Sequence, residues 1–168
     1  LFADQILFEV RHFPLVQIHP NATAAHRAAQ AAANQGKFWE MHDLLFQRLQ
    51  SWNTVNNPED VFEQYAQEIG LDMEQYREEV GTSEILGIIN ADIELGKSLG
   101  VSGTPTFFID GEVISDLTTI STVESFANLI EQKINEKTGT QNEPEETVES
   151  EEAAEDATLS RPEETQAQ

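Results

Sequence analysis

The chain contains no cysteine, and this absence limits its chemistry more than any other feature of its composition. Without a thiol, none of the 168 residues can form a disulfide bond or supply a thiolate as nucleophile or metal ligand. Cysteine usage ordinarily indicates whether a protein works in an oxidising compartment, and here it gives no such indication.

Basic residues are also scarce, because the chain has 9 Lys and Arg against 31 Asp and Glu, a formal net charge of −22. A nucleic-acid-binding surface needs a basic patch that displaces counterions from phosphates. This composition therefore excludes nucleic acid as a partner, and it disfavours docking on anionic lipid for the same reason.

Long apolar runs are missing as well, since none approaches the ~20 residues that cross a bilayer. No signal peptide is visible. Leu1 is not an initiating methionine, and the opening Leu1-Phe2-Ala3-Asp4-Gln5 looks like the interior of a longer chain. We therefore expect sequence upstream of Leu1, and whether it carries a membrane anchor stays open.

Acidic residues are most concentrated at the C-terminal end. Residues 138–168 hold 10 acidic residues and one arginine, which leaves −13 of the net −22 for residues 1–137. This end has only two large apolar residues, Val148 and Leu159, and so cannot bury enough surface to offset its ordering entropy. We predict a domain over 1–137 and a disordered acidic tail over 138–168. The tail is interpreted as a solvated extension, with partner binding as the alternative.

The residues that are present predict a short strand followed by a helical block. Ile6–Arg11 is an apolar run typical of a strand. Periodic apolar residues, alanine richness and stop signals at glycines then predict helices, with Asn21, Asn57, Asp72 and Thr82 or Ser83 as N-caps. The predicted helices span 22–34, 37–50, 58–69, 72–80 and 82–99.

The pattern changes after Gly100. Residues 106–109 and 112–114 are apolar and flank Asp110-Gly111, a two-residue hairpin signal. Ser121 and Glu124 have capping-box spacing, and a final amphipathic helix follows with Val123, Phe126, Ala127, Ile130 and Ile134 on one face.

Two segments carry a resemblance to a known family. Residues 101–111, VSGTPTFFIDG, are similar to the segment that opens a hairpin after a cis-proline in DsbA-like thiol–disulfide oxidoreductases of the thioredoxin superfamily. Residues 11–43, from RHFPL through HPNA to QGKFWEMHD, resemble the strand end and first inserted helices of that family. The resemblance implies an α/β thioredoxin-like fold with an all-helical insertion at about residues 20–100.

The family's first strand, its Cys-x-x-Cys pair and the helix that carries the pair are not among these residues. A strand with its crossover helix and partner strand takes about 30 residues or more. We therefore interpret 1–137 as a thioredoxin-like domain that lacks its first strand and helix. Because the lacking strand would be a central one, we expect the isolated piece to have unpaired ladder groups and low stability.

The resemblance places substrate binding at Gly103, Thr104 and Pro105, where an extended polypeptide substrate pairs with exposed backbone as an added strand. The alternative is an ordinary turn with a trans Pro105, since only about 5% of X–Pro bonds are cis. No catalytic residue is assigned, because the family's cysteines are absent, and no cofactor or metal is expected. The family's usual location implies an extracytoplasmic protein.

Other side chains have competing interpretations. The four histidines do not form a HExxH arrangement, so structural or surface roles are favoured over metal ligation. They are His12, His19, His26 and His42. Glu9 is interpreted as solvent-facing, with a buried proton-relay carboxylate as the alternative. Five aromatic residues are interpreted as core, with a peptide groove as the alternative: Phe38, Trp39, Phe46, Trp52 and Phe62.

Three functions follow as hypotheses. The first is a parent disulfide oxidoreductase of which this chain is a redox-inert part, tested by a Cys-x-x-Cys pair encoded upstream of Leu1. The second is a redox-inactive thioredoxin-fold module that holds extended peptides. The third is a plain helical domain with no site, which a trans Pro105 would favour. Oxidase, isomerase and reductase activities are not distinguished, because the residues between the cysteines tune the redox potential.

Overall fold

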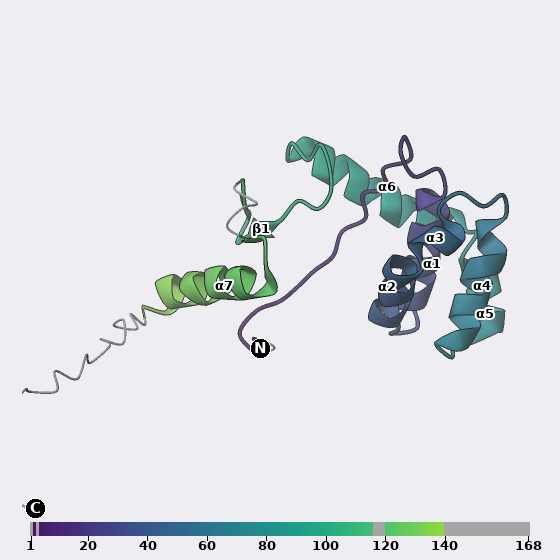
Figure 1. Ribbon diagram of the computed structural model, residues 1–168, viewed down its shortest axis with the longest axis horizontal. Coiled ribbons are helices and arrows are strands. Elements are labelled where there is room, and N and C mark those ends of the chain that lie inside the picture. Colours follow the sequence, from purple (N-terminus) through teal and green to yellow (C-terminus); the bar gives the residue numbers. More distant parts are fainter. Residues whose placement is uncertain (1, 3, 116–119, 140–168) are drawn as a thin grey trace, which may run out of the picture. The chain divides into compact units, whose positions relative to one another are not determined.

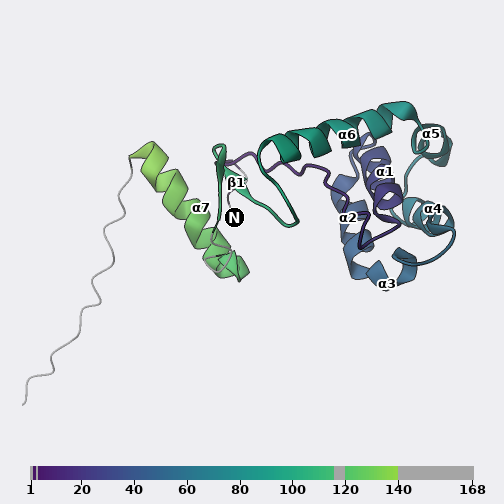
Figure 2. The same ribbon diagram turned by 90° about the horizontal axis from the view of Figure 1, so that it is seen from above.

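The first six helices form one block around α1. The computed structural model describes residues 2, 4–115 and 120–139 (Figure 1). The chain divides into two units, Leu1–Thr119 and Ile120–Gln168. In the first unit the helices are α1 (Ala22–Ala33), α2 (Phe38–Gln47), α3 (Leu49–Trp52), α4 (Pro58–Glu68), α5 (Met73–Glu79) and α6 (Ser83–Ser98). Helix α1 packs against α2, α4, α5 and α6, and Figure 2 shows α6 extending beyond the other helices.

Alanine in α1 lets its neighbours approach closely. Ala28, Ala31 and Ala32 are fully buried, and the largest fully buried side chains around them are Met41, Phe62, Ile85 and Ile89. A helix whose buried face carries only methyl groups brings adjacent backbones near one another, so that large side chains from several helices meet over it. The core of the first unit is therefore helical, as the sequence pattern predicts.

Two of the predicted N-caps are confirmed. Asp72 accepts hydrogen bonds from the backbone N–H groups of Glu74 and Gln75, and Thr82 accepts one from Ile85. The predicted caps at Asn21 and Asn57 make no side-chain cap bond. Asn21 instead donates to the carbonyl oxygens of Trp52 at 2.7 Å and Val55 at 2.9 Å, which uses its amide to hold the end of α3.

The predicted helix over 37–50 is interrupted at Arg48, where φ is −115° and ψ is 30°, and it continues as α3. The Arg48 guanidinium donates two hydrogen bonds of 2.6 Å to Glu68 and lies 5.2 Å over the Tyr65 ring. The break therefore occurs at a residue whose side chain is tied to α4.

Replacing Thr82 by alanine is expected to lower the free energy of unfolding by about 1 kcal/mol, since it removes the N-cap acceptor of α6. The Thr82 hydroxyl also donates to the Glu79 carbonyl at 2.7 Å, and that bond is lost too. Urea unfolding followed by circular dichroism measures the change. Thr54→Ala, at an exposed position outside the helices, is the matched control and is expected to change stability by less than about 0.5 kcal/mol.

The strand predicted at Ile6–Arg11 is wrong, because no strand is formed there. A strand is defined by ladder hydrogen bonds to a neighbour, and none of the described residues supplies one. Leu7 is 91% exposed and Phe8 52% exposed, so the apolar character that suggested a strand is left largely uncovered.

The predicted hairpin is confirmed but is shorter than expected. Strands β1 (Phe108–Ile109) and β2 (Glu112–Val113) pair antiparallel with Phe108 opposite Val113. Asp110 and Gly111 have φ values of 49° and 84°, which the two positions of a type I′ turn require. One further bond, from the N–H of Ile114 to the carbonyl of Phe107 at 2.9 Å, continues the pairing.

The second unit contains α7 (Val123–Thr138), as predicted, and Gly139 follows it in the left-handed conformation. The predicted capping box of Ser121 and Glu124 is wrong by one residue. The Thr122 hydroxyl accepts a hydrogen bond from the backbone N–H of Ser125, and the Ser125 hydroxyl oxygen accepts one from the backbone N–H of Thr122, the N–H that a Glu reaches in the usual capping box. Of the disordered tail predicted over 138–168, Thr138 is the last residue of α7 and Gly139 follows it, and the remainder, from 140 onward, lies outside the described residues.

Candidate functional site

The loop between α6 and β1 holds the three residues predicted to bind substrate. The peptide bond between Thr104 and Pro105 is cis. Thr104 and Pro105 are exposed and Gly103 is half-buried. Thr106 donates a hydrogen bond of 2.7 Å from its hydroxyl to the Gly103 carbonyl, which closes the loop around the two exposed residues. The backbone of Thr104 is therefore presented on a small, tied loop.

Beside this loop lies an open pocket of about 230 Å³. Of the three predicted residues, only Pro105 lines it. The other lining residues come from the end of α6, the loop and the hairpin: Leu99, Gly100, Val101, Ser102, Thr106, Phe108, Val113, Ile114 and Ser115.

The pocket combines apolar side chains with hydroxyl groups. Its walls are aliphatic and aromatic, with hydroxyl groups from Ser102, Thr106 and Ser115, and none of the lining residues titrates near neutral pH. Such a pocket can accept an apolar side chain while the adjacent backbone pairs with an extended chain. It has no group that can act as general acid, base or nucleophile at neutral pH.

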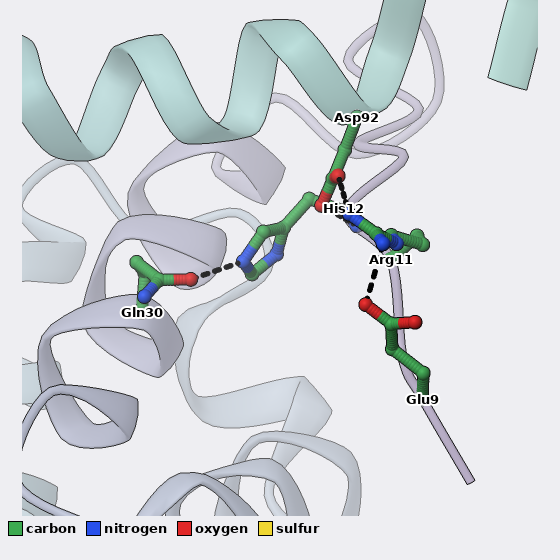
Figure 3. Close-up of polar contacts among 5 residues, drawn as sticks. All are labelled: Glu9, Arg11, His12, Gln30 and Asp92. Carbon is green, nitrogen blue, oxygen red and sulfur yellow. Dashed lines mark hydrogen bonds and ion pairs between the residues drawn. The ribbon is translucent and has the colours of Figure 1, made fainter. Parts of the chain in front are cut away.

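A second cluster of polar side chains lies where the N-terminal segment meets α1 and α6 (Figure 3). Asp92 of α6 is only 7% exposed and accepts a hydrogen bond of 2.9 Å from the backbone N–H of His12. Its other oxygen accepts one of 3.0 Å from Arg11. The buried carboxylate thus fixes the segment that precedes α1 to the middle of α6.

The His12 side chain, 5% exposed, bridges to α1 through both ring nitrogens. Nε2 lies 3.0 Å from Oε1 of Gln30, and Nδ1 lies 2.8 Å from Nδ1 of His26. Because Oε1 of Gln30 can only accept, the hydrogen bond to it requires a proton on His12 Nε2. The hydrogen bond between His12 and His26 requires a proton on one of their two Nδ1 atoms. Burial, followed by repulsion from His12, lowers the pKa of His26 to about 4.

The sequence did not predict this cluster, although it contained a signal for it. Asp92 follows Ile85 and Ile89 at helical spacing and so falls on the buried face of α6. A carboxylate at such a position needs a buried donor. Arg11 and His12 supply two donors. They precede Asp92 by about eighty residues, so the local sequence pattern does not predict the pairing.

The other histidines and Glu9 have ordinary surroundings. His19 contacts Asn53 at 3.0 Å and His42 contacts Asp43 at 3.0 Å. Among the residues that the structure describes, no three His, Asp or Glu side chains gather into a metal-binding group. Glu9 is paired with Arg11 at 2.5 Å, and both side chains are 57% exposed, so its solvent-facing interpretation is confirmed.

Of the five aromatic residues interpreted as core, two are confirmed, two are wrong, and Phe38 is half-buried and packs against the core. Trp52 and Phe62 are 7% and 1% exposed. Trp39 and Phe46, by contrast, are 47% and 72% exposed. The prediction placed these two residues in the core from helical spacing alone. The buried face of α2 carries Met41, Leu44 and Leu45, and Trp39 and Phe46 lie on another face.

Comparisons with known proteins agree on the fold. Residues 8–128 match the DSBA-like thioredoxin domain family. The crystal structure of a thioredoxin-like oxidoreductase from Silicibacter pomeroyi DSS-3 superposes with a TM-score of 0.53 at 24% identity, over 72% of this chain and 66% of that one. The predicted α/β thioredoxin-like fold with a helical insertion is thereby confirmed.

Curated relatives carry a different description. A protein named Na(+)/H(+) antiporter NhaA 3 from Salinispora tropica is 43% identical over 101 residues, which is 60% of this chain and 15% of that protein. Na(+)/H(+) antiporter NhaA 1 from Mycolicibacterium vanbaalenii is 39% identical over 114 residues, 66% of this chain and 17% of that protein. The chain spans less than a fifth of the length of these relatives. No helix within the described ranges is long and apolar enough to span a bilayer.

Proposed function

Because this chain belongs to the DSBA-like thioredoxin domain family, we propose that it is the substrate-binding part of a thiol–disulfide oxidoreductase that acts on extended polypeptides outside the cytoplasm. The observation that carries the proposal is the loop at Gly103, Thr104 and Pro105, which places the exposed Thr104 and Pro105 beside a pocket lined by apolar and hydroxyl side chains. An extended substrate would pair with the Thr104 backbone and place an apolar side chain against Pro105.

The redox step itself needs sulfur that these residues do not contain. In the proposed complete protein, a Cys-x-x-Cys pair at a helix N-terminus supplies it, because the helix dipole stabilises a thiolate there. A substrate thiolate attacks one sulfur of the oxidised pair and displaces the other as a thiolate, forming a mixed disulfide. A second substrate thiolate then resolves it, which oxidises the substrate dithiol and reduces the enzyme disulfide.

Uncovered apolar side chains support a further structural segment in that complete protein. Leu7 and Val10 are 91% and 39% exposed, and Val113 of the hairpin is 53% exposed. A strand laid against these two segments would cover such residues and satisfy their backbone groups. We propose that the strand and helix carrying the cysteine pair perform this role.

The 168-residue chain is expected to show no insulin reduction with dithiothreitol above a protein-free blank, since it has no thiol. The same assay on a polypeptide that includes the coding sequence upstream of Leu1 is expected to show turnover. Its control is the variant with both upstream cysteines changed to serine. An upstream sequence that encodes no cysteine pair, or a longer protein without turnover, would refute the oxidoreductase proposal.

Gly103→Leu is expected to weaken binding of a reduced, unfolded polypeptide by about tenfold, roughly 1.4 kcal/mol. A Cβ built at Gly103 meets no atom within 4 Å, so a side chain there fits the fold and adds bulk to the loop next to Thr104. Binding is measured by fluorescence anisotropy of a labelled peptide. Gly87→Leu on α6, where a Cβ also meets nothing within 4 Å, is the control and should bind as the parent chain does.

A second candidate is favoured by the antiporter relatives. They are 34–43% identical to the chain over 15–18% of their own length, so in those proteins the matching segment is a small part of a longer polypeptide. The alternative function is a redox-inactive, peptide-binding module attached to a cation antiporter. A coding sequence that joins these residues to an antiporter in one polypeptide, and that encodes no cysteine pair, would favour this alternative.

A further inference from the structure

Four aromatic rings form a continuous row on the outside of the helical block. Phe8 stacks on Trp39 with centroids 5.7 Å apart and an interplanar angle of 19°. Trp39 meets His42 edge-on at 5.3 Å, and His42 meets Phe46 at 4.7 Å. We call Phe8, Trp39, His42 and Phe46 the aromatic row.

The row lies on solvent although it is built like a packing face. Phe8, Trp39 and Phe46 are 52%, 47% and 72% exposed, and the His42 side chain is 32% exposed. Positions 39, 42 and 46 have the three- and four-residue spacing of one helix face, while Met41, Leu44 and Leu45 fill the buried face. Helix α2 is therefore apolar on two faces, and a contiguous exposed aromatic surface of this kind marks an interaction site.

The charges around the row are negative. Glu40 and Asp43 alternate with the ring-bearing positions of α2 and are 44% and 63% exposed, and α2 contains no Lys or Arg. The chain as a whole carries −22. A ligand at this surface therefore meets aromatic faces flanked by carboxylates.

One of these carboxylates is offset, because Lys37 pairs with Glu40 at 2.8 Å, whereas Asp43 contacts His42 of the row. In the described part of the first unit, each Lys or Arg side chain already contacts an acceptor. The pairs are Arg11 with Asp92 and Glu9, Lys37 with Glu40, Arg48 with Glu68, Arg77 with Glu63, Lys97 with Glu94, and Arg27 with two backbone carbonyls. An incoming anion finds no basic side chain here that lacks an acceptor, whereas an incoming cation finds the Asp43 carboxylate and ring faces.

We propose that the aromatic row binds cationic, extended segments of polypeptide substrates, in which Lys or Arg alternates with large apolar side chains. Ammonium and guanidinium groups are attracted to the faces of Trp and Phe and to the flanking carboxylates, while apolar side chains of the segment cover Phe46 and Trp39. The proposal rests on the proposed function in taking a polypeptide as the substrate, and it adds a charge and side-chain preference to it.

Charge also separates this occupant from a second copy of the chain. Two copies meeting at this face would bring their Asp43 carboxylates together, each on a chain of −22, while Lys37 is already paired with Glu40. A cationic segment instead neutralises the carboxylates that flank the rings. Charge complementarity therefore selects the basic polypeptide.

The test uses the 168-residue chain and two fluorescein-labelled peptides, one alternating lysine and leucine and one alternating glutamate and leucine. The lysine peptide is expected to bind, at least tenfold more tightly than the glutamate peptide, and more weakly at high salt. Phe46→Ser is expected to weaken binding at least tenfold, since a 72% exposed ring is removed without disturbing the core. Val123→Ser on α7, 83% exposed, is the control and should leave binding unchanged.

Intrinsic fluorescence provides an independent readout. Trp52 is buried and donates to the Leu45 carbonyl at 2.8 Å, so a change on peptide binding reports Trp39. Trp39→Phe is expected to abolish that change while keeping most of the affinity. Equal binding of both peptides, or of Phe46→Ser and the parent chain, would overturn the proposal.

Two further results would assign the row to another occupant and so also overturn the proposal. One is concentration-dependent self-association that Phe46→Ser abolishes, and the other is full protection of Trp39 from acrylamide quenching in the longer polypeptide. Failure of the proposed function looks different. If the longer protein has no disulfide exchange but Phe46→Ser still loses the lysine peptide, the row stands and the oxidoreductase proposal falls.

Discussion

Replacing Phe62 by alanine is expected to lower the free energy of unfolding by about 4 kcal/mol. Phe62 is 1% exposed and its ring lies 5.5 Å from that of Trp52 and 6.3 Å from that of Tyr65. The loss combines the transfer energy of the ring with the cavity left among helices that pack on α1. Since a domain of this size is stable by only about 5–15 kcal/mol, the substitution removes a large part of the total.

Urea unfolding followed by far-ultraviolet circular dichroism measures the effect. Phe46→Ala is the matched control, because it removes the same ring from a position that is 72% exposed, and it is expected to change stability by less than about 0.5 kcal/mol. Equal effects of the two substitutions would mean that α4 does not pack against the core as described.

Lowering the pH from about 6.5 to about 4 is expected to destabilise the chain by roughly 3 kcal/mol through His26 alone. The pKa of His26 is about 4 in the folded protein, against an ordinary value of 6.5. Above pH 6.5 the side chain is neutral in both states and the full stability is present. Below that value only the unfolded state binds the proton, so stability falls until the folded state also binds it near pH 4.

Carboxylates also titrate in this pH range, so the contribution of His26 to the pH dependence of stability is obtained by comparing the parent chain with a variant that lacks His26. The free energy of unfolding is measured against pH for the parent chain and for His26→Gln, and the two curves are expected to converge as the pH falls to 4. The groups around His26 are His12, which disfavours its protonation, and Asp92, which favours it. His42→Gln is the control, because His42 lies outside the cluster. Parallel curves for the parent and His26→Gln would contradict the assignment.

The same cluster explains how the N-terminal segment is held without a sheet. Its attachment to the helical block runs through the His12 and Arg11 contacts with Asp92 and through the packing of Phe13 near Gly96, where an added Cβ would lie 2.9 Å from the Phe13 ring. Before Arg11, Phe8 stacks on the exposed Trp39 and is still 52% exposed, and Leu7 is 91% exposed. Two consecutive parts of one segment therefore differ in burial because only one of them reaches buried partners within this chain.

Local signals in the sequence determined the helices and the turn. Alanine content and periodicity predicted α1 to within one residue, Asp72 and Thr82 predicted the starts of α5 and α6, and Asp110-Gly111 predicted the hairpin. These features depend on neighbours a few residues away, so the amino acids themselves contain the information. The residues around Gly103 and Pro105 likewise located the candidate loop and the family.

Tertiary structure alone decided three other features. Ile6–Arg11 has the composition of a strand, but a strand needs a ladder partner and none of the described residues provides it. Trp39, Phe46, Trp52 and Phe62 are all aromatic, yet two are core and two are surface, because burial depends on which face of a helix meets its neighbours. Asp92, Arg11 and His12 are brought together over about eighty residues. Burial and pairing between distant residues follow from the arrangement of the whole chain, which local patterns do not encode.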